Sequence, residues 1–325
     1  MLLAVVFVLT RFTEIENIAD VLSRGHIGFV GLALIAQGFW FVNLGRTYRD
    51  IYRLFDMPSK TFYMVRLATA ANFINVIAPA AGFSSMALFF SEARRRGIPI
   101  ARVTVASVLF VWFEYIGTLI SLVFGLGILA RGNNLHWSEI TASAILLAGA
   151  LGLATLLYLG MRSADLLARV LAWGARTVNK IVRPFINRAY LSEERAFSFA
   201  HEAAEGISAL RHQPREILDV LLMALFNKAL LILILWLTFM AFRVPVTLDV
   251  VVAGFSICYL FLIVSPTPAG LGIVEGILTV ALTGLKIPIG DATVVTLAFR
   301  AFTFWLPLLV GMITFRTLHI KTSEL

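Results

Sequence analysis

A break rich in proline and glycine interrupts one of the most apolar parts of the chain, at residues 265–276. Its sequence is Ser-Pro-Thr-Pro-Ala-Gly-Leu-Gly-Ile-Val-Glu-Gly, and Glu275 is its one charged residue. Lipid cannot hydrogen-bond to a broken backbone, so such a break persists at membrane depth only inside protein or beside a wet cavity. An acidic side chain there is costly and by default indicates a functional site. The alternative is a tight turn between two helices, with Glu275 at their interface.

The composition is that of a membrane protein. Of the 325 residues, 59% are hydrophobic and 14% are charged, whereas soluble domains carry about 25% charged residues. The predicted fold class is therefore an all-α protein that crosses the membrane several times. The single cysteine, Cys258, excludes an internal disulfide. The net charge of +8 fits anionic lipid headgroups better than nucleic acid, because the basic residues gather at the ends of apolar runs.

Five apolar runs are long enough to cross a bilayer, which takes about 20 residues of helix. Residues 1–9 are apolar but too few to cross alone, and residues 1–26 are predicted to form a short N-terminal helix followed by an external loop. The predicted spans are 27–45, 103–129, 140–161, 217–240 and 292–315.

Two further apolar runs are interrupted internally and are predicted to be re-entrant hairpins. The first, 61–93, breaks around Pro79 and Gly82 and has basic residues beyond both ends, so both ends are predicted to face the cytoplasm. The second, 249–285, contains the break described above and has few charges near its ends, which places both ends outside. A hairpin that enters and leaves on one side would put its tip inside the bilayer.

The distribution of basic residues gives the orientation. In this topology 19 of the 27 Lys and Arg lie in the predicted cytoplasmic segments, as the positive-inside rule requires. The chain is therefore expected to be a multi-pass protein of the cytoplasmic membrane with its C-terminal tail, 316–325, in the cytoplasm.

Residues 162–216 are predicted to be an amphipathic cytoplasmic linker. They carry nine Lys or Arg and a helical pattern without spanning length, which suits a helix lying in the headgroup layer. Ser192 is expected to cap a second amphipathic helix, and the alternative is an ordinary solvated linker. The first helix is expected to present one apolar face formed by Leu167, Val170, Leu171, Ala175, Val178, Ile181 and Val182.

The pattern predicts two inverted repeats, 27–129 and 217–315, joined by the connecting span in 130–161 and the linker. Each repeat holds a span, a broken hairpin and a second span, and the two hairpins are predicted to open toward opposite sides. Paired broken helices in opposed repeats are typical of transporters, whose substrate site lies near the bilayer midplane between the halves. Chance likeness between two runs broken by Pro and Gly is the alternative.

These features resemble the lysylphosphatidylglycerol synthase transmembrane region family, the flippase-like membrane domain of the multiple-peptide-resistance lipid synthases, which also occurs as stand-alone proteins. The resemblance implies two subdomains with re-entrant helices and a role in moving anionic or aminoacylated phospholipid between leaflets. Many members carry a Gly-Glu pair after the first break, where this chain has Gly82-Phe-Ser-Ser, so its substrate need not be aminoacyl-phosphatidylglycerol. The resemblance covers roughly 27–315 and rests on the segment 268–275, Arg300, the Asn75…Pro79…Gly82 break and the basic run 94–98.

Four charged residues deep in the apolar runs are the main site candidates. Glu114 and Arg300 occupy the last spans of the two repeats, where a mutual ion pair would satisfy both without a substrate. A lipid phosphate would be attracted to Lys228 or Arg300. Glu275 would bind a cationic headgroup or carry a coupling proton.

Other polar residues have a weaker case. Asn72 and Asn75, before the first break, could cap freed backbone groups or line the path. Arg66 and Glu92 lie near hairpin ends, from which they could reach the membrane interface. The predicted substrate-path residues are therefore Glu275, Arg300, Lys228, Glu114, Asn75, Pro79, Gly82, Pro268, Gly270 and Gly272.

No catalytic constellation stands out. The five histidines provide no pair one helical turn apart on a span, and no Ser or Cys has a recognisable base near it in sequence. We therefore expect neither an enzyme nor a cofactor or metal site. The expected function is translocation of an anionic, aminoacylated or polyprenyl-phosphate-linked lipid, with phospholipid as the partner, and with a homodimer or a lipid or glycan synthase as further associations. The alternatives are a membrane-embedded lipid-modifying enzyme and a non-transporting scaffold subunit.

Overall fold

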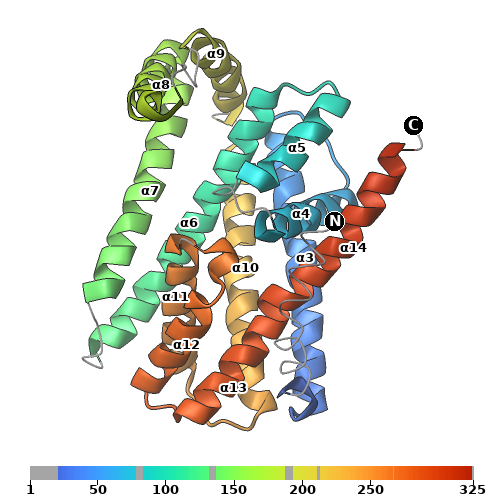
Figure 1. Cartoon of the computed structure of the whole chain (residues 1–325), viewed down its shortest axis with the longest axis vertical. Helices are drawn as coiled ribbons and strands as arrows, with labels where there is room; N and C mark the ends of the chain where they lie inside the picture. The colour runs from blue at the N-terminus through green and yellow to red at the C-terminus, as the bar shows by residue number, and fades with distance from the viewer. Residues whose placement is uncertain are drawn as a thin grey trace.

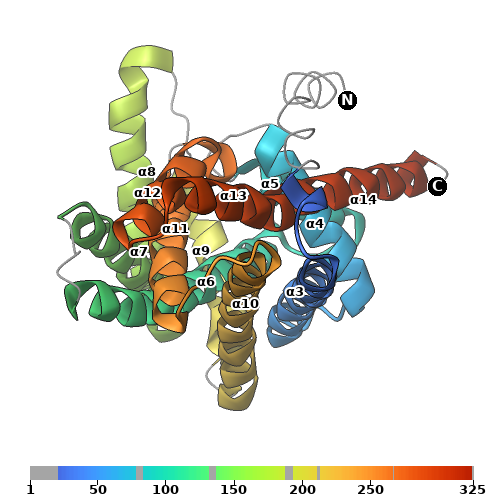
Figure 2. The same cartoon turned by 90° about the horizontal axis from the view of Figure 1, so that it is seen from below.

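The computed structural model of the chain describes residues 21–77, 83–131, 137–186, 193–210, 213–265 and 267–323. Every regular element in this part of the chain is a helix, as the sequence predicts. Several long helices run upright in Figure 1, and Figure 2 presents the same bundle from below. The predicted N-terminal helix lies mostly outside the described residues.

The five predicted spans are confirmed as helices long and apolar enough to cross a membrane. Large apolar side chains on them, such as Val123 and Leu151, are exposed, as lipid-facing positions are. The chain is therefore a multi-pass membrane protein. The spans are α3 (Ile27–Leu54), α6 (Ile100–Arg131), α7 (Trp137–Arg162), α10 (Pro214–Ala241) and the segment Ile289–Leu318, which joins α13 (Ile289–Arg300), the π-helical turn η3 (Ala301–Trp305) and most of α14 (Leu306–Ser323).

The second broken run forms two short helices, α11 (Leu248–Val264) and α12 (Ile273–Gly284), which pack against each other. At 17 and 12 residues both are shorter than the roughly 20 residues that a crossing needs. A 3-10 turn, η2 (Pro268–Gly270), lies between them. In Figure 1 the pair rises from the lower end of the molecule, and the end of the pair that carries η2 lies at mid-height.

The first broken run forms α4 (Thr61–Ile77) and α5 (Phe83–Arg95), which also pack against each other. The predicted break at Pro79 and Gly82 lies outside the described residues. In Figure 1 α3 ends and α6 begins at the upper end of the molecule. The chain therefore enters and leaves this pair from the end opposite to that of α11 and α12.

The contacts between helices are reciprocal between the halves 27–129 and 217–315. The first helices of the two halves, α3 and α10, pack on each other. In the first half α4 packs on α14 of the second half, and in the second half α11 packs on α6 of the first. Each hairpin therefore lies against the last span of the other half.

A glycine brings the helices together at each of these exchanged crossings. A Cβ on Gly311 of α14 would lie 2.5 Å from the Thr69 carbonyl oxygen of α4, and one on Gly125 of α6 would clash with the Ser256 side chain of α11. Small residues let helix backbones approach closely, which matters in lipid because apolar side chains gain little from associating there. The Ser256 hydroxyl also donates a 3.0 Å hydrogen bond to the Ser121 carbonyl across α11 and α6.

The predicted linker contains α8 (Ala164–Ile186) and α9 (Glu193–Ala209), which pack against each other and against α7. α8 lies across the direction of the spans, because it is seen nearly end-on in Figure 1 and extended in Figure 2. Ser192, the predicted cap of the second helix, lies outside the described residues.

The buried face of α8 differs from the predicted one. Val170 is 37% exposed and lies on the outer face with Arg169 and Trp173. Small alanines occupy the inner face instead, which allows close contact with the neighbouring helices. The side chains at positions 178, 181 and 182 lie outside the described part of the chain. The buried positions of α8 are Leu167, Ala168, Ala172 and Ala175.

We expect Gly125→Val to destabilise the protein by about 1 to 3 kcal/mol, the usual cost of overpacking, because the added atoms must push α6 away from α11. Gly127→Val is the matched control, since it makes the same change on the same helix but enters open space. Thermal unfolding in detergent measures both variants. Equal unfolding temperatures for the two would contradict the close crossing.

Candidate functional site

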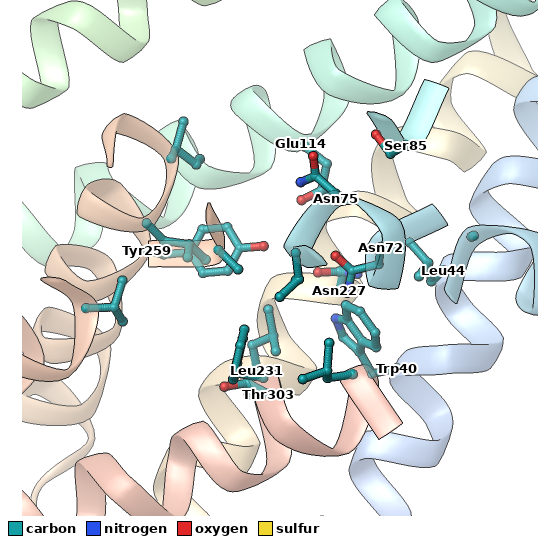
Figure 3. Close-up of a pocket in the computed structure, with 18 of the residues that line it drawn as sticks. Trp40, Leu44, Asn72, Asn75, Ser85, Glu114, Asn227, Leu231, Tyr259 and Thr303 are labelled. Carbon is teal, nitrogen blue, oxygen red and sulfur yellow. The ribbon is translucent and has the colours of Figure 1, made fainter. Parts of the chain in front are cut away.

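A cavity of about 610 Å³ lies between the two hairpins. Its lining comes from α4 and α5, from α11 and η2, and from the spans that surround them. Figure 3 presents the polar side chains of Glu114, Asn72, Asn75, Asn227 and Tyr259 among its lining. Helices of both halves therefore enclose one partly polar space within an apolar bundle.

The break in the second hairpin is built from left-handed backbone. Gly270 and Gly272 have φ values of +70° and +79°, which glycine adopts without a steric cost. Ala269 has a φ of +50°, which is unusual for a residue with a Cβ and persists only where the surroundings hold it. Ala269 also lines the cavity, so this strained position is part of the site.

Arg300, the last residue of α13, holds this break in place. Its Nε donates to Glu275 Oε1 at 2.6 Å and its Nη2 to the Ala269 carbonyl at 3.2 Å. The second oxygen of Glu275 accepts the Gly272 N–H at 2.7 Å, at the N-terminus of α12, where the helix dipole favours a carboxylate. The Arg300 side chain is 5% exposed and lies 4.6 Å from the centre of the Phe304 ring. The Arg300 guanidinium thus forms an ion pair with Glu275 and donates a hydrogen bond to the Ala269 carbonyl, which the break leaves outside a regular helix.

Lys228 of α10 forms a second buried ion pair. Its Nζ donates to Glu114 Oε2 at 2.5 Å and lies 3.9 Å from the centre of the Tyr259 ring. Lys228 is 1% exposed, whereas Glu114 and Tyr259 line the cavity. Burial removes the hydration of an ammonium, so it requires a counter-charge and benefits from an aromatic face. Lys228 therefore does not line the cavity itself but holds two residues that do, Glu114 and Tyr259.

Glu114 and Arg300 each pair with another residue, so the mutual ion pair that the sequence offered as an alternative to a substrate role is wrong. Glu114 binds Lys228 of the other half, and Arg300 binds Glu275 of its own half. The reason is the packing: α6 lies against α10, and α13 lies against α12. Each buried cation is consequently neutralised by one acid, and the four side chains together carry no net charge.

Most of the remaining polar lining is neutral. Asn72 and Asn75 of α4 and Asn227 of α10 bring amide groups to the cavity. Asn227 Oδ1 and Trp40 Nε1 are buried and have no hydrogen-bond partner among the described residues. In Figure 3 Asn72, Asn227 and Trp40 gather on one side of the cavity, and Tyr259 projects from the opposite side.

The structure brings most of the predicted substrate-path residues to this region. Pro79 and Gly82 lie outside the described residues. Sequence reasoning missed Trp40, Tyr259 and Thr303, because single aromatic and hydroxyl residues are common in apolar helices and no spacing sets the lining ones apart. Of the predicted residues, Glu114, Asn75 and Arg300 line the cavity, Lys228 and Glu275 pair with lining residues, and Pro268, Gly270 and Gly272 form the break.

Two other predicted candidates interact elsewhere. Arg66 donates to the Thr317 hydroxyl at 2.9 Å. Glu92 accepts from Arg96 Nε at 2.5 Å, one helical turn along the chain. Both interactions are exposed, and neither residue lines the cavity formed by the described residues.

We expect Glu114→Leu to destabilise the protein by about 3 to 5 kcal/mol, because it leaves the buried Lys228 charge without a counter-ion. The double variant Glu114→Leu/Lys228→Met removes both charges and is expected to recover most of that loss. Thermal unfolding in detergent compares the two. A double variant that is less stable than the single one would show that the pair is not the main role of Glu114.

Arg300 and Glu275 are expected to be energetically coupled. Arg300→Lys cannot keep both the Nε and the Nη2 contact, since a lysine presents a single nitrogen. In a double-mutant cycle with Glu275→Gln, the interaction energy should be about 0.5 to 3 kcal/mol. Arg169→Lys on the exposed face of α8 serves as the control partner, and its cycle with Glu275→Gln should be additive. Additivity in both cycles would contradict the coupling between Arg300 and Glu275.

Comparisons with known proteins agree with this architecture. A family model described as "Lysylphosphatidylglycerol synthase TM region" matches residues 1–311, which include both hairpins and Arg300. No curated protein matches the chain significantly. A match over this much of the chain shows that it belongs to the lysylphosphatidylglycerol synthase transmembrane region family.

Proposed function

We propose that this protein moves a phospholipid headgroup between the leaflets through the cavity, while the acyl chains stay in the surrounding lipid. The observation that carries the proposal is the partly polar cavity between two helix pairs, α4–α5 and α11–α12, that enter from opposite ends of the molecule. In transporters of this kind, broken helices bring half-helix ends and free backbone groups to the bilayer midplane. Membership of a family named for a lipid synthase supports a lipid as the cargo.

The proposal includes two inverted repeats whose hairpins are re-entrant. The reciprocal helix contacts and the glycine at each exchanged crossing support this reading. α8, α9 and the C-terminal end of α14 all lie at the upper end of the molecule in Figure 1, which supports one cytoplasmic face that carries the basic segments. The exposed side chains of Arg169, Trp173 and Arg176 on α8 suit the headgroup layer of that face.

Arg300 would bind the lipid phosphate. A guanidinium has five N–H donors, and the contacts to Glu275 and Ala269 engage its Nε and Nη2, so it can still donate to a phosphate in the cavity. Because Glu275 neutralises Arg300, the phosphate would be held chiefly by hydrogen bonds rather than by a net positive field. Binding of that moderate strength allows both entry and release, as conduction through any pathway requires.

We expect proteoliposomes containing the wild-type protein to expose inner-leaflet, headgroup-labelled phosphatidylglycerol to an external quencher faster than empty vesicles. Glu114→Leu/Lys228→Met should keep the fold but slow exposure by about tenfold or more, because it replaces the charged wall of the cavity with apolar side chains. Glu202→Gln, an exposed acid on α9, is the matched control and should transport as wild type does.

Two results would count against transport. Wild-type vesicles that match empty ones for several anionic lipids, with and without an imposed ion gradient, would favour a scaffold for a partner lipid or glycan synthase. Chemical conversion of the labelled lipid, detected by mass spectrometry and lost in a single-residue variant, would favour an enzyme.

A further inference from the structure

A groove of about 750 Å³ lies along the second hairpin, apart from the cavity between the hairpins. Most of its wall comes from α12, and the rest comes from α11, the end of α6 and the beginnings of α7 and α13. α11 contributes Ile257 and Phe261 to this groove but Cys258 and Tyr259 to the cavity. The hairpin therefore stands between two separate spaces, and we refer to the second as the α12 groove.

Two glycines make the α12 groove deep. α12 packs on α11 and α13, and its open face carries Gly276, Val280 and Gly284, which all line the groove. A Cβ on Gly276 or Gly284 would meet no described atom within 4 Å, and Val280 is 72% exposed. Unlike Gly125 and Gly311, these glycines do not serve a close helix crossing. They leave space along an apolar surface.

The groove has the length of one leaflet. Its lining follows α12 from end to end, over 12 residues, which make about 18 Å of helix. Half of the hydrocarbon core of a bilayer is about 15 Å thick. In Figure 1 α12 runs from mid-height toward the lower end of the molecule. A partner's transmembrane helix would have to cross both leaflets, whereas an acyl chain crosses one, so the groove fits an acyl chain.

The lower end of the groove suits the phosphate of a lipid. Trp137 begins α7 there and is 82% exposed, and tryptophan is enriched at the membrane–water interface. Lys286 directly follows the lining residue Leu285, Arg131 ends α6, and both basic residues are exposed. Glu139, the one charged residue of the described lining, is 7% exposed and already interacts within the chain. An interfacial phosphate would therefore lie near two basic side chains, with apolar walls beyond it.

We propose that the α12 groove binds one acyl chain of a phospholipid from the leaflet at the lower end of the molecule, with the phosphate near Arg131 and Lys286. The bound chain covers the open face of α12. Helices associate in lipid through close packing, so a chain held in the groove adds packing to a hairpin helix that is too short to span. This site is separate from the cavity and does not depend on transport through it.

Photocrosslinking in vesicles tests the site. The purified full chain is reconstituted with phosphatidylglycerol that carries a diazirine within one acyl chain, and adducts are mapped by mass spectrometry after irradiation. Wild type should be labelled at Ile257 and Phe261 of the groove wall. That labelling should fall about tenfold in Gly276→Leu and, separately, in Gly284→Leu, because the added side chain takes the space of the acyl chain. Labelling at Leu151, an exposed residue of α7, should not change.

Gly152→Leu is the matched control. Gly152 is an exposed glycine of α7, a Cβ there also meets no described atom within 4 Å, and it does not line the groove. This variant should keep the wild-type labelling. Thermal unfolding in detergent checks that each variant folds, and the two groove variants are independent, so either one alone is sufficient for the test.

The phosphate is tested by the double variant Arg131→Gln/Lys286→Gln. It should reduce groove labelling by the phosphatidylglycerol probe about fivefold or more, the effect expected from removing basic residues near an anionic lipid. Labelling by a diacylglycerol with the same diazirine chain, which lacks the phosphate, should stay as in wild type. An equal loss for both probes, or no loss for either, would overturn the placement of the phosphate.

Two results would overturn the acyl-chain site itself. The first is labelling of Ile257 and Phe261 that stays at the wild-type level in both Gly276→Leu and Gly284→Leu. The second is a wild type that is not labelled in the groove and forms a dimer in light scattering that both variants dissociate. That result would assign the groove to a second copy of the chain.

Discussion

Two buried cations determine how this molecule is held together. Arg300 and Lys228 lie within an apolar bundle, where a charge without a counter-ion is strongly disfavoured, and each is held by a carboxylate. Arg300 ties α13 to the break ahead of α12, and Lys228 ties α10 to α6. These helices are also walls of the cavity. The contact between α10 and α6, the shape of the break and the charged part of the site therefore depend on the same four side chains.

The exchange of hairpins between the halves creates the cavity. Asn72 and Glu114 come from the first half and Asn227 and Tyr259 from the second, and all four line one space. Neither half could enclose that space alone, because each hairpin packs on the last span of the other half. In lipid, where apolar contacts between helices are weakly favoured, the glycine crossings and the ion pairs supply the specificity that a hydrophobic core supplies in water.

Much of this helical arrangement could be predicted from the sequence, because it depends on long runs of apolar residues. A span of 20 or more apolar residues is a strong signal, and all five predicted spans are helices of spanning length. The break at 265–276 was also visible, because Pro and Gly inside an apolar run have few explanations. The partner of Glu114 was not predictable, since it depends on how α6 packs against α10. Tyr259 and Trp40 were missed for the same reason: their role comes from their position in space and not from any local pattern.

The π-helical turn at Ala301–Trp305 divides the last span into two segments that pack on different helices. Before the turn, α13 packs on α12, and after it, α14 packs on α4. Such turns have wider, weaker hydrogen-bond ladders than the α-helix around them and are frequent at functional sites. The π-helical turn is thus the position at which the last span can bend most easily, and Arg300 lies immediately before it. A bend there would change the angle between the part of the span that packs on α12 and the part that packs on α4, and both parts contribute lining to the space between the two hairpins.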